Sequence, residues 1–177
     1  MGIIIRKMDE TSAHLFNQFT RTFTVSSKVV LDMTHGKLTW AVTPVEPYEK
    51  EIPIDEVDPA SLINSEDKVV FLAEVDGKPA GQIKLITWWN GYAYIDDLIV
   101  NPQFRSRGVG KALMEAAIQW SRERRFPGIM LETQDDNVTA CTLYQSCGFV
   151  LSGFDRNVYK AINPNTKETA LYWYLIF

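Results

Sequence analysis

The residues between positions 92 and 111 combine three features that together predict an anion-binding site. An alternating apolar segment ends at Asn101-Pro102, a basic loop with two glycines follows, and an apolar-periodic helix begins at once. Backbone N–H groups at the start of a helix have no intrahelical partner, and the helix dipole adds partial positive charge there. Glycine lets such a backbone approach a ligand closely, and arginine and lysine add full charges. The loop therefore predicts a phosphate-bearing cofactor. The residues expected to bind this cofactor are Arg105, Ser106, Arg107, Gly108, Val109, Gly110 and Lys111.

Two common phosphate-binding motifs do not fit this loop. A Walker loop needs serine or threonine after its Gly-Lys pair, and here alanine follows Lys111. The dinucleotide fingerprint needs a third glycine where this chain has Leu113. The remaining pattern, Arg105-x-x-Gly108-x-Gly110, resembles the acyl-coenzyme-A loop of the GCN5-related N-acetyltransferase (GNAT) family. The resemblance implies acetyl-CoA as co-substrate, with its pyrophosphate held by loop amides. One glycine that is usual in the family's loop is a serine here.

A second motif, Asn137-x-x-Ala140-x-x-x-Tyr144-x-x-x-Gly148-Phe149, is similar to another GNAT segment. The resemblance implies that the Asn137 side chain contacts the pantetheine arm. It also implies that the Tyr144 hydroxyl lies near the thioester sulfur, where it could protonate the departing thiolate. Asn137 suits the N-cap of a helix as well. A structural interpretation stays open for Tyr144, because it shares a helical face with apolar neighbours and could be a core aromatic.

Two neighbouring carboxylates, Asp96 and Asp97, precede the loop. In several amine acetyltransferases of the family a Glu-Asp pair stands here, so the resemblance implies a general base. The shorter aspartate side chain favours a bridging water over direct proton abstraction. Side chains alternate along a strand, so only one of the two is expected to point at the thioester. Carboxylates that simply face water are the alternative. In the family's arrangement the amides of Leu98, Ile99 and Val100 would stabilise the developing oxyanion.

A closer resemblance, to the streptothricin acetyltransferases, is carried by residues 131–141, 94–97 and 171–174. Those enzymes acetylate an amino group of the β-lysine moiety of streptothricin antibiotics, which are polycations. Carboxylates near the site would attract such an acceptor, and the candidate substrate-binding residues are Asp97, Glu132 and Asp136. Two alternatives stay open. One is the same fold acting on another cationic amine, such as a polyamine, an aminoglycoside or a protein lysine. The other is a non-catalytic acyl-CoA-binding sensor, although the candidate acid and bases favour an enzyme.

The whole chain is typical of one soluble domain spanning residues 1–177. Its net charge of −4 argues against nucleic acid and anionic membranes as partners. No apolar run is long enough to span a bilayer, and the first residues lack the layout of a signal peptide. Cys141 and Cys147 are too far apart along a predicted helix for a disulfide, which fits the cytoplasm. No Cys/His spacing suggests a metal. Exposed aromatic strands such as Leu171–Phe177 leave a homodimer open.

The elements that position these residues follow from apolar periodicity and turn signals. Before position 69 the pattern is weak. It predicts a strand at Ile3–Lys7, a helix capped by Ser12 and a short helix near Val29–Met33. The proline-containing acidic segment Pro44–Asp58 is predicted to be irregular, within an insertion at about 37–66.

After position 69 the signals sharpen into a core at about 69–149 that would carry acetyl-CoA. Helices are predicted at Gly110–Arg124 and Val138–Cys147, the second ending at Gly148. The predicted strands are Val69–Val75, Ala80–Trp89, Tyr92–Val100, Ile129–Gln134, Phe149–Tyr159 and Thr169–Phe177. This order predicts an α+β fold of GNAT type: a mostly antiparallel twisted sheet with helices on both faces. A splayed parallel pair, Tyr92–Val100 with Ile129–Gln134, is expected at the cofactor site.

Overall fold

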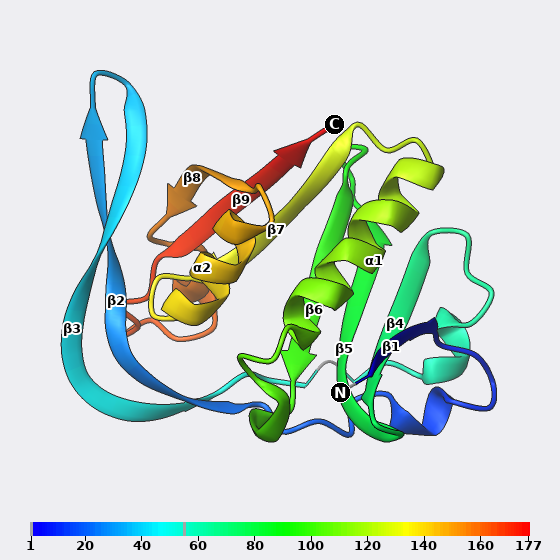
Figure 1. Cartoon of the computed structure of the whole chain (residues 1–177). Helices are drawn as coiled ribbons and strands as arrows, with labels where there is room; N and C mark the ends of the chain where they lie inside the picture. Colours follow the sequence, from blue (N-terminus) through cyan, green and yellow to red (C-terminus); the bar gives the residue numbers. More distant parts are fainter. Residues whose placement is uncertain (1, 55) are drawn as a thin grey trace. The chain divides into compact units, whose positions relative to one another are not determined.

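The computed structural model describes residues 2–54 and 56–177. The chain divides into two compact units (Figure 1). The first comprises residues 1–22, 51–129 and 176–177, and the second comprises residues 23–50 and 130–175. The candidate loop and Asp96 and Asp97 belong to the first unit, whereas Glu132, Asp136 and the second motif belong to the second.

An antiparallel sheet forms the frame of the first unit. Its strands are hydrogen-bonded in the order β1 (Ile3–Lys7), β4 (Lys68–Val75), β5 (Lys78–Thr87) and β6 (Ala93–Val100). Tight turns join the last three strands. Asp76 and Gly77 have φ angles of 50° and 77°, and Gly91 has a φ of 87°. Glycine and aspartate tolerate this left-handed backbone better than most residues, which explains why these sequences make hairpins.

Each face of this sheet has its own cover. Helix α1 (Val109–Glu123) contacts all four strands and buries an apolar stripe of Val109, Leu113, Met114 and Ala117. The other face packs on the short 3-10 helices η1 (Ala13–Leu15) and η2 (Pro59–Leu62). Its apolar cluster consists of Met8, Phe16, Phe19, Leu62, Val70, Leu72 and Ile99. A further 3-10 helix, η3 (Pro102–Phe104), leads from β6 into the candidate loop.

The second unit holds a long hairpin and a small α/β element. The hairpin consists of β2 (Thr22–Thr34) and β3 (Lys37–Glu51), joined by a left-handed turn at His35-Gly36. The α/β element runs through β7 (Gly128–Gln134), α2 (Val138–Ser146), β8 (Val150–Asp155), η4 (Val158–Ala161) and β9 (Ala170–Ile176). Its strands are hydrogen-bonded in the order β7-β9-β8, and β8 and β9 are antiparallel.

From position 68 onward the predicted elements are confirmed within a few residues, as is the first strand. Three predictions before that point were wrong. Ser12 precedes only the single turn of η1, and Val29–Met33 lies in β2 rather than in a helix. The first half of the supposed irregular insertion is strand, because β3 (Lys37–Glu51) continues through both Pro44 and Pro47. Proline is tolerated there because β3 pairs with β2 alone, so one side of the strand needs no N–H donors.

Candidate active site

The loop between β6 and α1 has the backbone shape of an anion cradle. Ser106 and Gly108 both adopt left-handed conformations, with φ of 57° and 87°, and α1 begins at Val109. The first helical hydrogen bond runs from the Ala112 N–H to the Gly108 carbonyl, 3.0 Å apart. The N–H groups of residues 109–111 therefore come before the first intrahelical hydrogen bond and are not used by the helix. Residues 106–108 are exposed. This arrangement fits a pyrophosphate, because backbone N–H donors, the positive end of the helix dipole and basic side chains all lie at the start of α1.

Arg105, for which a phosphate contact stays a prediction, binds backbone carbonyls in this structure. Its Nε donates to the Val100 carbonyl at 3.0 Å, and one terminal nitrogen donates to the Thr22 carbonyl at 2.9 Å. The side chain thus ties the start of the loop to the end of β6. Burial lowers the pKa of Arg105 from its usual value. The full charges that remain on the exposed part of the loop are those of Arg107 and Lys111.

A β-bulge changes the geometry of the two aspartates. Lys84 of β5 pairs with Asp97, and the next residue, Leu85, pairs with Ile95, so Asp96 is the extra residue. A bulge places two residues of one strand opposite one residue of its partner. Lys84 accordingly reaches Asp96 as well, with its Nζ 2.5 Å from Asp96 Oδ2. The expectation that the two carboxylates point to opposite faces was therefore wrong: both lie on the face of Lys84.

The surroundings of Asp97 leave little room for a ligand. Arg21 donates to both of its oxygens, from Nη1 at 2.9 Å and from Nη2 at 3.1 Å. Gln82 donates to Oδ2 at 2.6 Å. Asn17 completes the cluster by accepting hydrogen bonds from Arg21 and Gln82. Asp97 is thus the acceptor of a buried polar network, and the substrate contact predicted for it gains no support from this geometry.

Sequence reasoning missed the partners Asn17, Arg21, Gln82 and Lys84. A signal for two of them was present. Gln82 and Lys84 are the polar residues of an otherwise apolar stretch of β5, and both are buried. Buried polar side chains are retained when they are paired. Arg21 gives no such signal, because it follows a weakly patterned segment and meets Asp97 only in the folded chain.

In the second unit, Asn137 has the predicted capping role. Its Oδ1 accepts from the Ala140 N–H at 3.2 Å, at the start of α2. The cap uses the oxygen, so a contact with a pantetheine arm would come from the Nδ2 group. Tyr144 is buried on the same helix, with its ring 6.2 Å from that of Phe149 and 6.3 Å from that of Trp173. Packing alone accounts for the ring, and the role of the hydroxyl remains a prediction.

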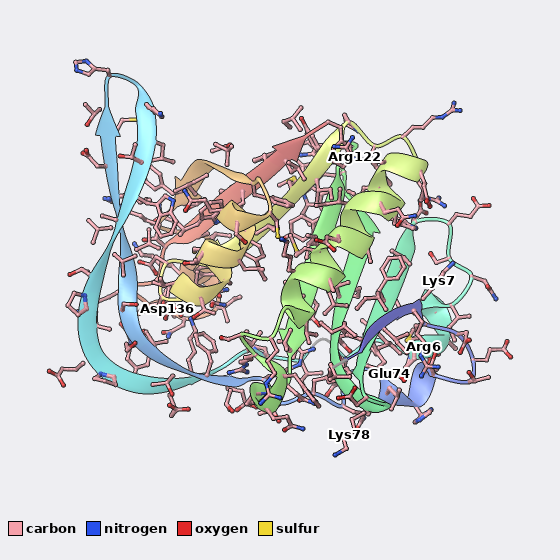
Figure 2. All side chains as sticks on the ribbon, in the orientation of Figure 1. Arg6, Lys7, Glu74, Lys78, Arg122 and Asp136 are labelled. Carbon is pink, nitrogen blue, oxygen red and sulfur yellow. The ribbon has the colours of Figure 1, made fainter. Side chains whose placement is uncertain are left out.

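The predicted substrate residue Asp136 is buried and paired rather than open. Lys50 Nζ lies 2.7 Å from Oδ1, and the Tyr48 hydroxyl donates to Oδ2 at 2.8 Å. Lys50 also pairs with Glu168. Figure 2 shows Asp136 at the start of α2, beside the β2–β3 hairpin that carries Lys50 and Tyr48. These contacts fasten the hairpin to the start of α2, so Asp136 is not available to attract a cation.

Glu132 of β7 is half-buried and accepts from the Tyr159 hydroxyl at 2.5 Å. Burial, followed by the Glu132 carboxylate, raises the pKa of Tyr159 above its usual value, so this hydroxyl stays a neutral donor. Burial likewise raises the pKa of Asp135. Of the predicted acidic substrate residues in this unit, Glu132 is therefore the one whose carboxylate lacks a cationic partner among the described residues.

The structure brings the candidate loop, Asp96, Asp97 and the β6 residues Leu98, Ile99 and Val100 into the first unit. Glu132, Asp136, Asn137 and Tyr144 come together in the second. The predicted splayed pair would join β6 with β7 and stays a prediction. Among the described residues no group of His, Cys, Asp or Glu side chains could hold a metal ion. No described helix is long and apolar enough to cross a membrane.

Comparisons with known proteins agree on one family. The model of the GNAT acetyltransferase family matches residues 37–149. Streptothricin acetyltransferase A of Bacillus subtilis is 35% identical over 98% of this chain and 100% of its own length. A streptothricin acetyltransferase of Escherichia coli is 39% identical over 73% of this chain and 71% of its own.

A solved structure shares the fold over nearly the whole chain. It is a putative streptothricin acetyltransferase from Bacillus anthracis in complex with acetyl coenzyme A. Its TM-score is 0.93 at 38% identity, covering 99% of this chain and 100% of that one. The predicted α+β fold class is thereby confirmed.

Proposed function

This chain belongs to the GNAT family of acetyltransferases, and from that premise we propose that it acetylates streptothricin with acetyl-CoA as the acetyl donor. The acceptor would be an amino group of the antibiotic's β-lysine moiety. One observation carries the choice of acceptor. The relative from Bacillus subtilis aligns along its entire length, so the regions outside the cofactor loop, where an acceptor is selected, match as well.

Binding of the donor is assigned to the loop of the first unit. Gly108 in its left-handed conformation starts α1 so that the N–H groups of residues 109–111 remain available to the pyrophosphate. Arg107 and Lys111 would add charge from exposed positions. Arg105 would act indirectly, by holding the loop to β6. Asn137 would contact the pantetheine arm.

Asp96 is the better candidate for the general base. Both oxygens of Asp97 receive hydrogen bonds from Arg21 and Gln82 also donates to it, whereas Asp96 pairs with Lys84 and has the more exposed side chain, 24% against 14%. A water bound at Oδ1 of Asp96 could take the proton of the acceptor ammonium. The neutral amine would then attack the thioester carbonyl, with amides at the end of β6 donating to its oxygen.

The transfer is completed when the C–S bond breaks and the new amide forms. The acetyl carbon then carries the acceptor nitrogen, and coenzyme A leaves as a thiolate. We assign the protonation of this thiolate to the Tyr144 hydroxyl. The nitrogen loses two protons: the first passes through the water beside Asp96 to solvent, and the second, released as the amide forms, restores the Tyr144 hydroxyl through solvent, so charge and protons balance across the reaction.

A thiol-release assay with an amine panel tests the proposal. Streptothricin should give the highest kcat/KM, above spermidine, an aminoglycoside and a histone-tail peptide. Mass spectrometry of the product should show one added acetyl group on the β-lysine moiety. A sensitive bacterium that expresses the chain should become resistant. Sensitive cells combined with efficient acetylation of spermidine would refute streptothricin as the acceptor. Binding of acetyl-CoA without turnover of any amine would identify a sensor instead.

A further inference from the structure

A buried lysine lies next to the proposed base. We infer that Lys84 is a positioning residue for acetyl transfer: by pairing with Oδ2 it fixes the Asp96 carboxylate for proton transfer from the attacking amine. The inference rests on the proposed function, because it requires Asp96 to act as the base. Lys84 itself would contact neither substrate.

The fold gives Lys84 an unusual environment. It stands in the middle of β5 and is only 4% exposed. In the sheet it pairs with Val70 on one side and with Asp97 on the other, on the face that carries the apolar cluster of η1 and η2. Lysine is almost never so buried without a charged partner, because removing its ammonium from water is costly. The bulge at Asp96 supplies that partner at 2.5 Å.

The contact restricts Asp96 in a specific way. Lys84 Nζ lies 2.5 Å from Asp96 Oδ2, so the carboxylate is held from the buried side of the sheet. The Asp96 side chain is 24% exposed, compared with 14% for Asp97. The Asp96 carboxylate is therefore anchored from inside the protein by Lys84 and is still partly exposed to solvent. A base held in this orientation loses little rotational freedom when the reaction proceeds.

The charges on this face argue for orientation rather than for attraction of a cation. Arg21 pairs with Asp97 and Lys84 pairs with Asp96, so within these four described residues the two positive and two negative charges cancel. A cationic acceptor thus gains little from this cluster by net charge. What the cluster provides is two carboxylates with different surroundings: Asp97 accepts hydrogen bonds from Arg21 and Gln82, and Asp96 pairs with Lys84 and is more exposed.

A double-mutant cycle on kcat tests the inference. Lys84→Met keeps the length of the side chain and removes its charge, and it should lower kcat roughly ten- to hundredfold, the range for a displaced catalytic group. The KM for acetyl-CoA should stay within about twofold. In the Asp96→Asn background, Lys84→Met should change kcat by no more than about twofold, since its effect passes through Asp96. Lys78→Met is the matched control, because Lys78 is exposed on the same strand and points away from the sheet (Figure 2).

Two further measurements keep the outcomes separate. Thermal melting reports whether each variant is folded. Lys84→Gln replaces Lys84→Met in this test if the methionine variant does not fold. Its side chain can still donate a hydrogen bond to Asp96 Oδ2, so its kcat should lie between those of wild type and Asp96→Asn. If Lys84→Met lowers kcat by the same factor in the wild-type and Asp96→Asn backgrounds, the inference is overturned and the proposed function is left intact. An unchanged kcat in Asp96→Asn, with the amine still acetylated, would remove the base assignment and the inference together.

Discussion

At the scale of single residues, partners decide what each candidate side chain can do. Asp96 and Asp97 are neighbours of the same type, yet Arg21 and Gln82 bind Asp97, whereas Lys84 binds Asp96. Asp136 carries the same carboxylate but is buried under Lys50 and Tyr48. A carboxylate already paired with a buried cation gains little from a second one, because its charge is compensated and its oxygens are desolvated.

Tyr144→Phe tests the proposed acid. The substitution keeps the ring that packs against Phe149 and Trp173, so the fold should be preserved. We expect kcat to fall by roughly 10²-fold, the lower end of general acid catalysis. The KM for acetyl-CoA should change little. The measurement is steady-state kinetics under conditions where the chemical step limits the rate. If kcat is unchanged there, Tyr144 is a core aromatic and another group protonates the thiolate.

The two cysteines should differ in reactivity. Burial raises the pKa of the Cys141 thiol to about 12, and Cys147 is only half-buried. Alkylation requires the thiolate, so at about pH 8.5, where an unperturbed thiol is half ionised, native Cys141 should react far more slowly than Cys147. Peptide mass spectrometry after iodoacetamide treatment would measure both. In denaturant the difference should vanish, and equal native rates would contradict the burial of Cys141.

At the scale of elements, two irregularities shape the candidate site. The bulge in β6 brings Asp96 to the same face as Asp97. The left-handed residues Ser106 and Gly108 then turn the chain into α1. Both features depart from regular geometry next to the residues proposed to bind and react, as strained backbone often does at functional sites.

Gly108→Val should weaken binding of acetyl-CoA by at least tenfold, equivalent to about 1.4 kcal/mol. Space is not the reason, because an added Cβ would meet only Ile3 Cδ1, at 3.7 Å. The reason is the φ of 87°, which a β-branched residue strongly disfavours. The loop would rearrange and its amides would no longer converge. Calorimetry on the folded variant measures the affinity for acetyl-CoA. Gly2→Ala is the control, because a Cβ added at Gly2 meets no atom within 4 Å. Unchanged affinity would remove this loop from the cofactor site.

Asp136→Asn should destabilise the second unit without a direct effect on substrate contacts. It weakens the bonds from Lys50 and Tyr48 that hold the β2–β3 hairpin to the start of α2. Because hydrogen bonds to charged groups contribute about 1.5–3 kcal/mol, Tm should fall by several degrees, at roughly 2–4 °C per kcal/mol. Glu46→Gln, an exposed carboxylate on β3, should leave Tm unchanged. An unaltered Tm combined with a raised KM for streptothricin would restore Asp136 as a substrate residue.

At the scale of the whole molecule, the net negative charge of the chain affects the binding of the acceptor and of acetyl-CoA differently. The chain has a net charge of −4, and Glu46, Glu49 and Glu51 are exposed on β3. A polycationic acceptor is attracted over several ångströms by such a surface, whereas acetyl-CoA depends on the local cations of its loop.

Salt should therefore raise the KM for streptothricin more than the KM for acetyl-CoA. Screening shortens the reach of exposed charges from about 10 Å at 0.1 M salt to about 3 Å at 1 M. Weaker attraction raises the acceptor's KM. For acetyl-CoA, weaker binding to the loop is partly offset by weaker repulsion from the acidic chain. Initial rates at both salt concentrations measure the effect. Equal increases in the two KM values would show that the acidic surface plays no part in acceptor capture.

The sequence by itself determined the elements with strong local signals. Asp76-Gly77 and Asn90-Gly91 specify hairpins because few other residues accept their backbone angles. The spacing of Val109, Leu113 and Ala117 predicts α1 because one helical stripe must be buried. The basic glycine loop falls between these elements, so its position before a helix, and hence a phosphate-bearing ligand, followed from local patterns, whereas acetyl-CoA was implied by the resemblance to the GNAT loop.

Only the tertiary structure decided which carboxylates are available. Arg21 lies 76 residues from Asp97 and Lys50 lies 86 residues from Asp136, and neither pair has a periodic signal. The bulge that turns Asp96 towards Lys84 depends on the register of two strands, which no single segment encodes. The strand β3 was missed because its prolines are acceptable only on an unpaired edge. Local sequence specifies backbone conformation, but pairing between distant side chains is set by where the folded chain brings them together.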